Sequence, residues 1–147
     1  LVREMGSKEQ LAEQYWLLAE AQVGLQQWDA AVQSAQQSVT LASEIGSKLI
    51  QGQALCTLAK IASAQNDLAR AEDQIRHSIQ VLTDLNNPFE LAKSQYQWAL
   101  VQHQRGQWED ARQTLEIVYN VFAKLGAEAE RQQAQTNLAQ WMPNTNG

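Results

Sequence analysis

LASEIGS, at Leu41–Ser47, is matched 40 residues earlier by LVREMGS, at Leu1–Ser7. The same spacing relates other small residues, namely Ala19, Ala59, Ala99 and Ala139, then Ala31, Ala71 and Ala111, and then Gly46, Asn86 and Gly126. A fixed period of about 20–50 residues is typical of repeat proteins, in which each unit buries its apolar face only against its neighbours. The sequence therefore predicts about three and a half copies of one structural unit.

Each period contains two stretches with helical spacing of apolar residues, separated by a short break. In the first unit these stretches are Lys8–Gly24 and Trp28–Ile45. Apolar side chains that recur every three or four residues form one stripe along a helix, as Leu11, Tyr15 and Leu18 do. With only two prolines and seven glycines in 147 residues, long helices are expected. The pattern predicts an all-α fold of about seven helices.

Residues at the predicted helix ends support this division. Gly46, Asn86 and Gly126 lie just beyond the second helices, where a left-handed residue is favoured. Side-chain caps are expected at Ser7 with Gln10, at Asp67, and at Asn87 with Glu90, where Pro88 suits the first helical position. Gln27 and Gln107 are poor caps for the remaining second helices.

These boundaries predict one domain built of stacked units. The expected units are residues 1–6 as the tail of a truncated preceding repeat, 7–46, 47–86 and 87–126 as three repeats, 127–142 as a carboxyl-terminal capping helix, and 143–147 as a tail. Because the chain begins at Leu1 within a matched segment, we expect a further repeat to precede it in a longer protein. The apolar face around Leu11 would then be uncovered and favour self-association. Ala134, Leu138 and Trp141 are expected to face inward from the capping helix.

Small residues face each other across each predicted helix pair, and a large apolar residue precedes those of the second helix. The matching positions are Leu18–Ala19, Leu58–Ala59, Trp98–Ala99 and Leu138–Ala139 in the first helices, and Trp28 with Ala31, Leu68 with Ala71 and Trp108 with Ala111 in the second helices. This pattern resembles the tetratricopeptide repeat. The 40-residue unit resembles the longer variant of MalT-like and antibiotic-regulator-type bacterial activators and multidomain signalling proteins. The turn glycine is present only as Gly106, and the closing proline of the standard repeat is missing.

The resemblance implies a right-handed superhelical solenoid whose first helices line a concave groove. The helical angle of about 100° per residue then selects the side chains that face this groove. They are Glu13, Trp16 and Glu20, then Cys56 and Lys60, then Lys93, Tyr96, Leu100 and His103, with Gln140 from the capping helix. Such a mixture of aromatic and polar side chains suits an extended peptide or a partner helix. In the alternative interpretation, Trp16 and Tyr96 only pack between neighbouring first helices.

No set of residues in the sequence predicts catalysis, a metal site or a cofactor. Cys56 lies in an apolar helical stretch, where cysteine is usually a small hydrophobic residue. His77 and His103 have neither the i, i+4 spacing nor the neighbouring cysteines or carboxylates of a zinc site. No glycine-rich phosphate loop occurs. We therefore expect that the protein is not an enzyme.

Charge and composition restrict the partners. The net charge of −5 disfavours nucleic acid, which requires clustered Lys and Arg. No run of about 18 apolar residues predicts a membrane span, and no secretion leader opens the chain. The single cysteine fits a reducing compartment, so a cytoplasmic location is expected.

Together these features predict a protein–protein interaction module in the carboxyl-terminal part of a larger bacterial regulatory or signalling protein. Its partner would be a protein, a peptide or another domain of the same chain. The Lys and Asn pattern with which some tetratricopeptide domains hold a chaperone carboxylate is not matched. The alternative is a structural spacer or self-association element that positions catalytic domains. A small-molecule sensor would need a closed apolar pocket, which so few repeats seldom form.

Overall fold

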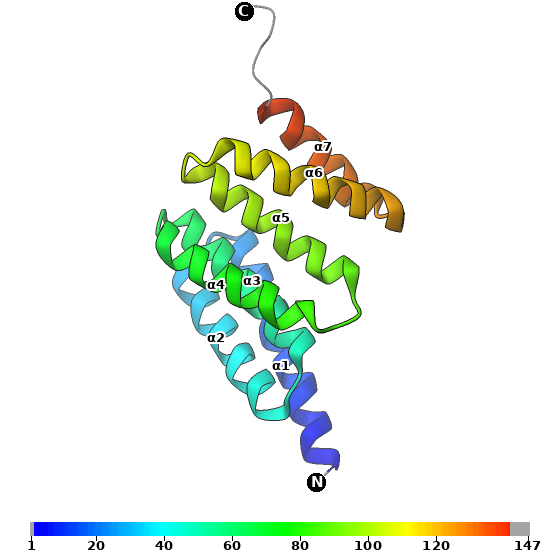
Figure 1. Ribbon diagram of the computed structural model, residues 1–147. Coiled ribbons are helices and arrows are strands. Elements are labelled where there is room, and N and C mark those ends of the chain that lie inside the picture. Colours follow the sequence, from blue (N-terminus) through cyan, green and yellow to red (C-terminus); the bar gives the residue numbers. More distant parts are fainter. Residues whose placement is uncertain (1, 142–147) are drawn as a thin grey trace, which may run out of the picture.

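The computed structural model describes the backbone of residues 2–141 and the side chains of residues 6–141. This part of the chain is all-helical, with seven helices and no strand (Figure 1). The helices are α1 (Val2–Gly24), α2 (Trp28–Ile45), α3 (Lys48–Ala64), α4 (Leu68–Thr83), α5 (Pro88–Gln104), α6 (Trp108–Leu125) and α7 (Glu128–Trp141). The predictions of an all-α fold and of about seven helices are confirmed. Leu1 and residues 142–147, which include the expected tail, lie outside the described residues.

Each helix packs mainly against the helices that precede and follow it in the chain. The pairs α1–α2, α3–α4 and α5–α6 have the most extensive contacts, and α2–α3, α4–α5 and α6–α7 join one pair to the next. In addition, α1 contacts α3, and α3 contacts α5. The pairs follow one another from the amino-terminal to the carboxyl-terminal end of the described chain (Figure 1). Equivalent positions on α1, α3 and α5 are therefore brought close together.

The helix ends largely follow the sequence. Gly46 and Gly126 adopt the left-handed conformation that was expected, with φ of 74° and 71°. The side chains of Asp67 and Asn87 accept hydrogen bonds from backbone N–H groups at the starts of α4 and α5. Asn86 differs, because α4 already ends at Thr83 and its cap residue is right-handed. The turn within the first two pairs needs a left-handed residue even without glycine, and Gln26 and Asn66 adopt φ of 59° and 62°.

The predicted helix boundary at Gly6–Ser7 is wrong. Residues 2–6, expected as the tail of a separate helix, are instead the first turns of α1, so Ser7 with Gln10 caps no helix. At Gly46 the chain must reverse so that α3 packs against α2. At Gly6 the described chain makes no such reversal. A glycine inside a helix is destabilising by only about 1 kcal/mol relative to alanine, so the helix continues.

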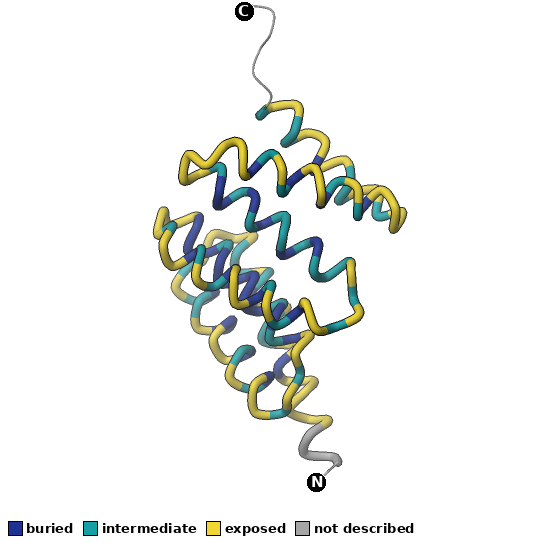
Figure 2. Tube along the Cα trace, in the orientation of Figure 1, coloured by how far each residue is buried: buried dark blue, intermediate teal, exposed yellow. Residues whose placement is uncertain are grey.

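Alanines at equivalent positions are buried where the helices of each pair meet, as the sequence predicted. Ala19, Ala59 and Ala99 are completely buried in the first helices, and Ala31, Ala71 and Ala111 are completely buried in the second helices. Figure 2 shows the buried positions recurring along the inner sides of successive helices. Ala139 occupies the equivalent position in α7 but is exposed. Ala134 of α7 is buried with Leu138 and Trp141 packed beside it, which confirms the expected inner face of this helix.

Candidate functional site

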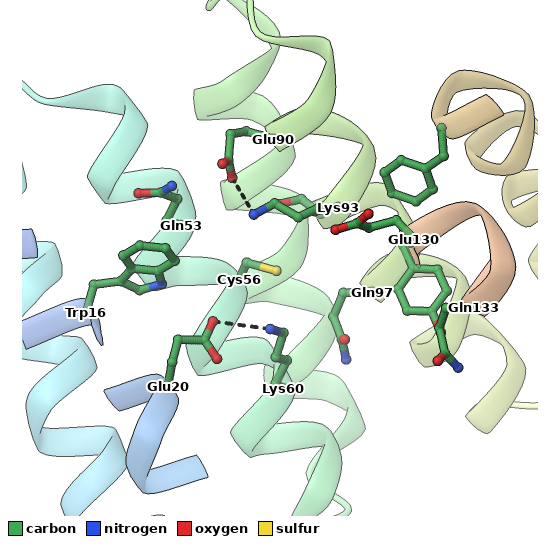
Figure 3. Close-up of a pocket in the computed structure, with 13 residues that line it drawn as sticks. Trp16, Glu20, Gln53, Cys56, Lys60, Glu90, Lys93, Gln97, Glu130 and Gln133 are labelled. Carbon is green, nitrogen blue, oxygen red and sulfur yellow. Dashed lines mark hydrogen bonds and ion pairs between the residues drawn. The ribbon is translucent and has the colours of Figure 1, made fainter. Parts of the chain in front are cut away.

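A pocket of about 180 Å³ opens between the first helices of the three pairs (Figure 3). Six of the ten residues expected in the groove line it, namely Trp16, Glu20, Cys56, Lys60, Lys93 and Tyr96. Trp16 and Glu20 come from α1, Cys56 and Lys60 from α3, and Lys93 and Tyr96 from α5. The structure therefore brings together side chains that are 40 residues apart in the sequence.

The other four expected residues, Glu13, Leu100, His103 and Gln140, do not line this pocket. The His103 ring stacks on the Trp141 ring, with 4.2 Å between centroids and 10° between planes. His103 thus joins α5 to the capping helix. Glu13 and Gln140 are exposed. The helical angle selects one side of each helix, and the pocket is lined by only part of the residues so selected.

Seven further residues complete the lining: Gln53, Glu90, Ser94, Gln97, Phe122, Glu130 and Gln133. The helical period was a usable signal for Glu90 and Gln97, because they lie three and four residues from Lys93 on the same side of α5. No sequence signal identified Phe122 of α6 or Glu130 of α7. They reach the pocket because α6 packs against α5 and α7 packs against α6.

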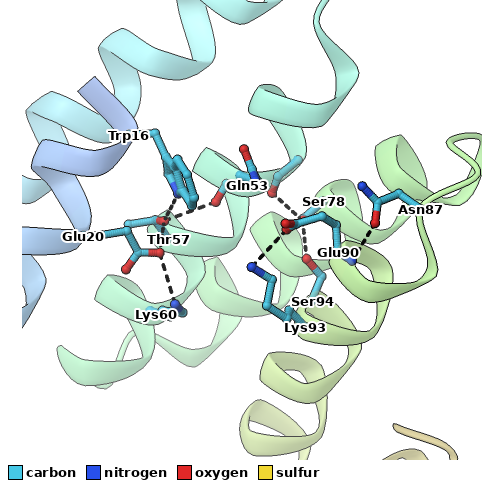
Figure 4. Close-up of polar contacts among 11 residues, drawn as sticks. Trp16, Glu20, Gln53, Thr57, Lys60, Ser78, Asn87, Glu90, Lys93 and Ser94 are labelled. Carbon is cyan, nitrogen blue, oxygen red and sulfur yellow. Dashed lines mark hydrogen bonds and ion pairs between the residues drawn. The ribbon is translucent and has the colours of Figure 1, made fainter. Parts of the chain in front are cut away.

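One wall of the pocket is held by hydrogen bonds between α1 and α3 (Figure 4). The Trp16 Nε1–H donates to Thr57 Oγ1 at 3.1 Å. The hydroxyl of Thr57, which is completely buried, lies 3.0 Å from the Glu20 carboxylate, to which it can donate. Lys60 Nζ donates to the same Glu20 oxygen at 3.2 Å. Thr57 therefore connects the aromatic wall to the charged rim.

We predict that Thr57→Val removes the hydrogen bonds by which Thr57 of α3 holds Trp16 and Glu20 of α1. Valine keeps the shape of threonine but provides neither an acceptor for Trp16 nor a donor for Glu20. Losing these bonds while the groups stay partly buried should destabilise the fold by about 1–3 kcal/mol. Thermal unfolding measures the loss, and Thr83→Val, on the exposed end of α4, is the matched control. A change in Thr57→Val no larger than in the control would contradict the coupling.

The opposite wall carries a second charged pair. Lys93 Nζ lies 3.2 Å from Glu90 and 4.8 Å from the centre of the Phe89 ring. Beneath this pair, the Ser78 hydroxyl donates to the Gly52 carbonyl at 2.7 Å and lies 2.9 Å from the Ser94 hydroxyl (Figure 4). These bonds join α3, α4 and α5 below the pocket.

The ionisable side chains around the pocket have an excess of one negative charge. Its lining includes the carboxylates of Glu20, Glu90 and Glu130 and the ammonium groups of Lys60 and Lys93. Each lysine is paired with a glutamate, and Glu130 makes no ion pair with another residue of the described part of the chain. The rim therefore favours a neutral or cationic ligand over an anionic one.

Burial sets the ionisation of the groups inside the pocket. It raises the pKa of the Cys56 thiol, against the smaller opposing effect of Lys60. Burial also raises the pKa of the Tyr96 phenol, and its hydroxyl donates to Asn137 of α7. For Lys60, burial lowers the pKa, but attraction to Cys56, when ionised, and to Glu20 outweighs burial and raises it. At neutral pH the floor of the pocket is an uncharged thiol.

We expect the Cys56 thiol to react slowly with a disulfide reagent at pH 8. Only 8% of this residue is exposed, and its raised pKa reduces the thiolate that attacks. The native rate should be lower than that of the denatured chain by about tenfold or more. The raised pKa of Cys56 should also lower the free energy of unfolding as the pH rises above the ordinary thiol pKa of about 8.5. The reason is that the thiol of the unfolded chain loses its proton at a lower pH than the thiol of the folded chain. Equal native and denatured rates would contradict this assignment.

The sequence matches no protein-family model, and no curated protein is significantly similar to it. Within residues 2–141 no helix has both the length and the apolar character needed to cross a bilayer. The same described residues contain no group of three or more His, Cys, Asp or Glu side chains placed to hold a metal ion. The pocket itself is therefore the feature from which function is argued.

Proposed function

We propose that the chain is a tetratricopeptide-like module that binds a peptide or helix of a protein partner, or of another domain of its own chain, on the face formed by α1, α3 and α5. Its helix pairs would form a right-handed superhelical solenoid with this face on the concave side. The contacts of α1 with α3 and of α3 with α5 support that arrangement. So does the burial of equivalent alanines in each pair.

The observation that carries the proposal is the composition of the pocket lining. Trp16 and Tyr96 provide apolar walls, and Glu20 and Lys60 form a polar rim beside them. Aromatic surface with a few placed polar groups is typical of sites that bind ligands. Catalysis is not proposed, because the only nucleophilic thiol in the pocket is uncharged and Cys56 has no histidine beside it in the lining. By the resemblance to bacterial regulators, the parent protein would be a cytoplasmic regulatory or signalling protein.

Peptide selection tests the proposal. Peptides chosen from a random display library on the wild-type protein should bind Trp16→Ala and Tyr96→Ala about tenfold or more weakly, since buried aromatic contacts dominate such interfaces. Trp108→Ala is the matched control, because this tryptophan of α6 is 68% exposed and outside the pocket lining. Failure to select any peptide, or selected peptides that bind the two pocket variants as well as wild type, would refute the proposed function.

A second candidate function is self-association, which is favoured by an apolar stripe on α1. Leu11 and Leu18 of α1, and Leu25 directly after its end, are seven residues apart and 42%, 46% and 69% exposed. The seven-residue spacing places Leu11 and Leu18 along one side of the helix. The equivalents of Leu18 on the next two first helices, Leu58 and Trp98, instead pack against the preceding pair. The exposed stripe is the surface that a second copy would cover if the chain acts as a spacer or self-association element.

Sedimentation distinguishes this role from peptide binding. Self-association through α1 predicts a dimer at micromolar concentration that Leu11→Gln/Leu18→Gln converts to a monomer. Leu125→Gln, which alters an exposed leucine at the end of α6, should leave the dimer intact. A monomeric wild-type protein up to about 100 μM would exclude self-association as the function of this chain.

A further inference from the structure

The pocket lies at an interruption in a column of aromatic side chains. Trp16, Cys56 and Tyr96 occupy equivalent positions, 40 residues apart, on α1, α3 and α5. The first and third are aromatic, and all three line the pocket (Figure 3). The middle position carries only a thiol. The space that an aromatic ring would fill at position 56 is therefore open.

Each aromatic residue of the column donates a hydrogen bond to the next first helix, 41 residues along the chain. Trp16 Nε1–H donates to Thr57, and the Tyr96 hydroxyl donates to Asn137. Thr57, Gln97 and Asn137 are themselves equivalent positions, 40 residues apart. An aromatic residue at position 56 would, by the same geometry, donate to Gln97.

The amide of Gln97 lacks such a partner. Gln97 is 6% exposed and lines the pocket, and no residue of the described chain forms a hydrogen bond with its side chain. The amide atoms of Gln97 are not among the buried polar atoms that lack a partner. They are therefore open to the pocket, where a donor on a ligand can replace solvent. The equivalent positions on α3 and α7 indicate which donor fits. The Thr57 hydroxyl oxygen accepts from an indole N–H, and the Asn137 amide oxygen accepts from a phenol O–H.

We infer that the pocket takes a tyrosine or tryptophan side chain from a bound peptide, whose O–H or N–H donates to Gln97. The aromatic ring of the ligand then fills the space that an aromatic side chain at position 56 would occupy. The volume of about 180 Å³ suits one ring, because an engineered apolar cavity of about 150 Å³ in another protein binds benzene. This inference rests on the proposed function and specifies the residue that the groove recognises.

The charges around the pocket specify the neighbours of that aromatic residue. Three glutamates and two lysines line it, and both lysines already pair with glutamates. Basic residues beside the inserted tyrosine or tryptophan would be attracted to this excess of carboxylate, and acidic ones would be repelled. The preferred ligand is therefore an aromatic residue in a basic segment.

Single-residue probes test the pocket directly. N-acetyltyrosinamide, N-acetylphenylalaninamide and N-acetylleucinamide are titrated into the labelled protein while the Trp16 indole N–H signal is followed by NMR. The tyrosine probe should bind about 2–10-fold more tightly than the phenylalanine probe, corresponding to one hydrogen bond. Leucine should bind most weakly. Equal binding of the three probes, or the absence of binding by all three, would overturn the inference.

Two variants assign the binding to the proposed atoms. Gln97→Leu should abolish the preference for tyrosine over phenylalanine, because leucine cannot accept the hydroxyl proton. Cys56→Tyr should eliminate probe binding, since the ring then occupies the pocket from within the chain. His77→Tyr, which adds a tyrosine at an exposed position of α4 outside the pocket lining, is its control and should bind the probes as wild type does. A tyrosine preference that survives Gln97→Leu would contradict the role of Gln97, whether or not Cys56→Tyr folds.

Peptides separate this inference from the proposed function. A tyrosine flanked by two arginines should bind at least threefold more tightly than one flanked by two glutamates, and added salt should reduce the difference. If library-selected peptides lose affinity in Trp16→Ala but bind Cys56→Tyr unchanged, the groove binds peptides and the aromatic pocket is refuted. If no selected peptide depends on Trp16 or Tyr96, the proposed function itself fails.

Discussion

Phe122→Ala is expected to destabilise the protein by about 3–5 kcal/mol, the range typical of removing a buried phenylalanine. Phe122 is 1% exposed and packs with Ala92 and Val118. Its ring meets the Phe89 ring edge-on, with 6.1 Å between centroids. Truncation leaves a cavity between α5 and α6 that fixed helices cannot collapse to fill. Because Phe122 also lines the pocket, the same change should loosen its Tyr96 side.

Chemical denaturation measures this loss of free energy. Leu125→Ala is the control on the same helix, because 43% of Leu125 is exposed and its truncation should cost well under 2 kcal/mol. Loss of the α5–α6 contact should also weaken protection of α7 amides from hydrogen exchange, since α7 packs on α6. A loss of less than about 1 kcal/mol for Phe122→Ala would show that this cluster does not hold the carboxyl-terminal pair together.

Gly52→Ala is expected to destabilise the protein by about 1–3 kcal/mol, the typical result of overpacking a core. Alanine normally stabilises the interior of a helix by about 1 kcal/mol relative to glycine. At position 52, however, an added Cβ would lie 2.4 Å from Leu82 Cγ and 2.5 Å from its Cδ2. Leu82 is 1% exposed and cannot swing into solvent. Because α3 and α4 approach closely at this point, replacing glycine by alanine destabilises the protein here instead of stabilising it.

Two further substitutions test this steric explanation, one as a control and one that removes the clash. Gly6 lies inside α1 with nothing within 4 Å of an added Cβ, so Gly6→Ala should stabilise by about 1 kcal/mol. Leu82→Ala alone should cost about 2–5 kcal/mol, but in that background Gly52→Ala should become neutral or stabilising. The first pair already combines Ala12 with Ala42 at the equivalent positions, in one core cluster. Additive effects of the two substitutions in denaturation experiments would refute the steric coupling.

The site was only partly predictable because the repeat defines a side of a helix and not the extent of a pocket. The period placed Trp16, Cys56 and Tyr96 in one column, and the structure has all three in the pocket lining. The same period predicted Leu100 and His103 beside them, yet neither lines the pocket, and His103 stacks on Trp141 instead. That contact depends on where α7 lies relative to α5, which no spacing within the sequence expresses.

The sequence by itself determined the number of helices, most of their ends and the alanine contacts between them. These features depend on interactions within one helix or between adjacent helices, so a local period and local capping residues express them. Only the tertiary structure decided that α1 continues through Gly6, that Gly52 must admit Leu82, and that the Gln97 amide faces an empty position. Each of these depends on whether a side chain from a different helix is present at one point in space, and sequence spacing does not specify that.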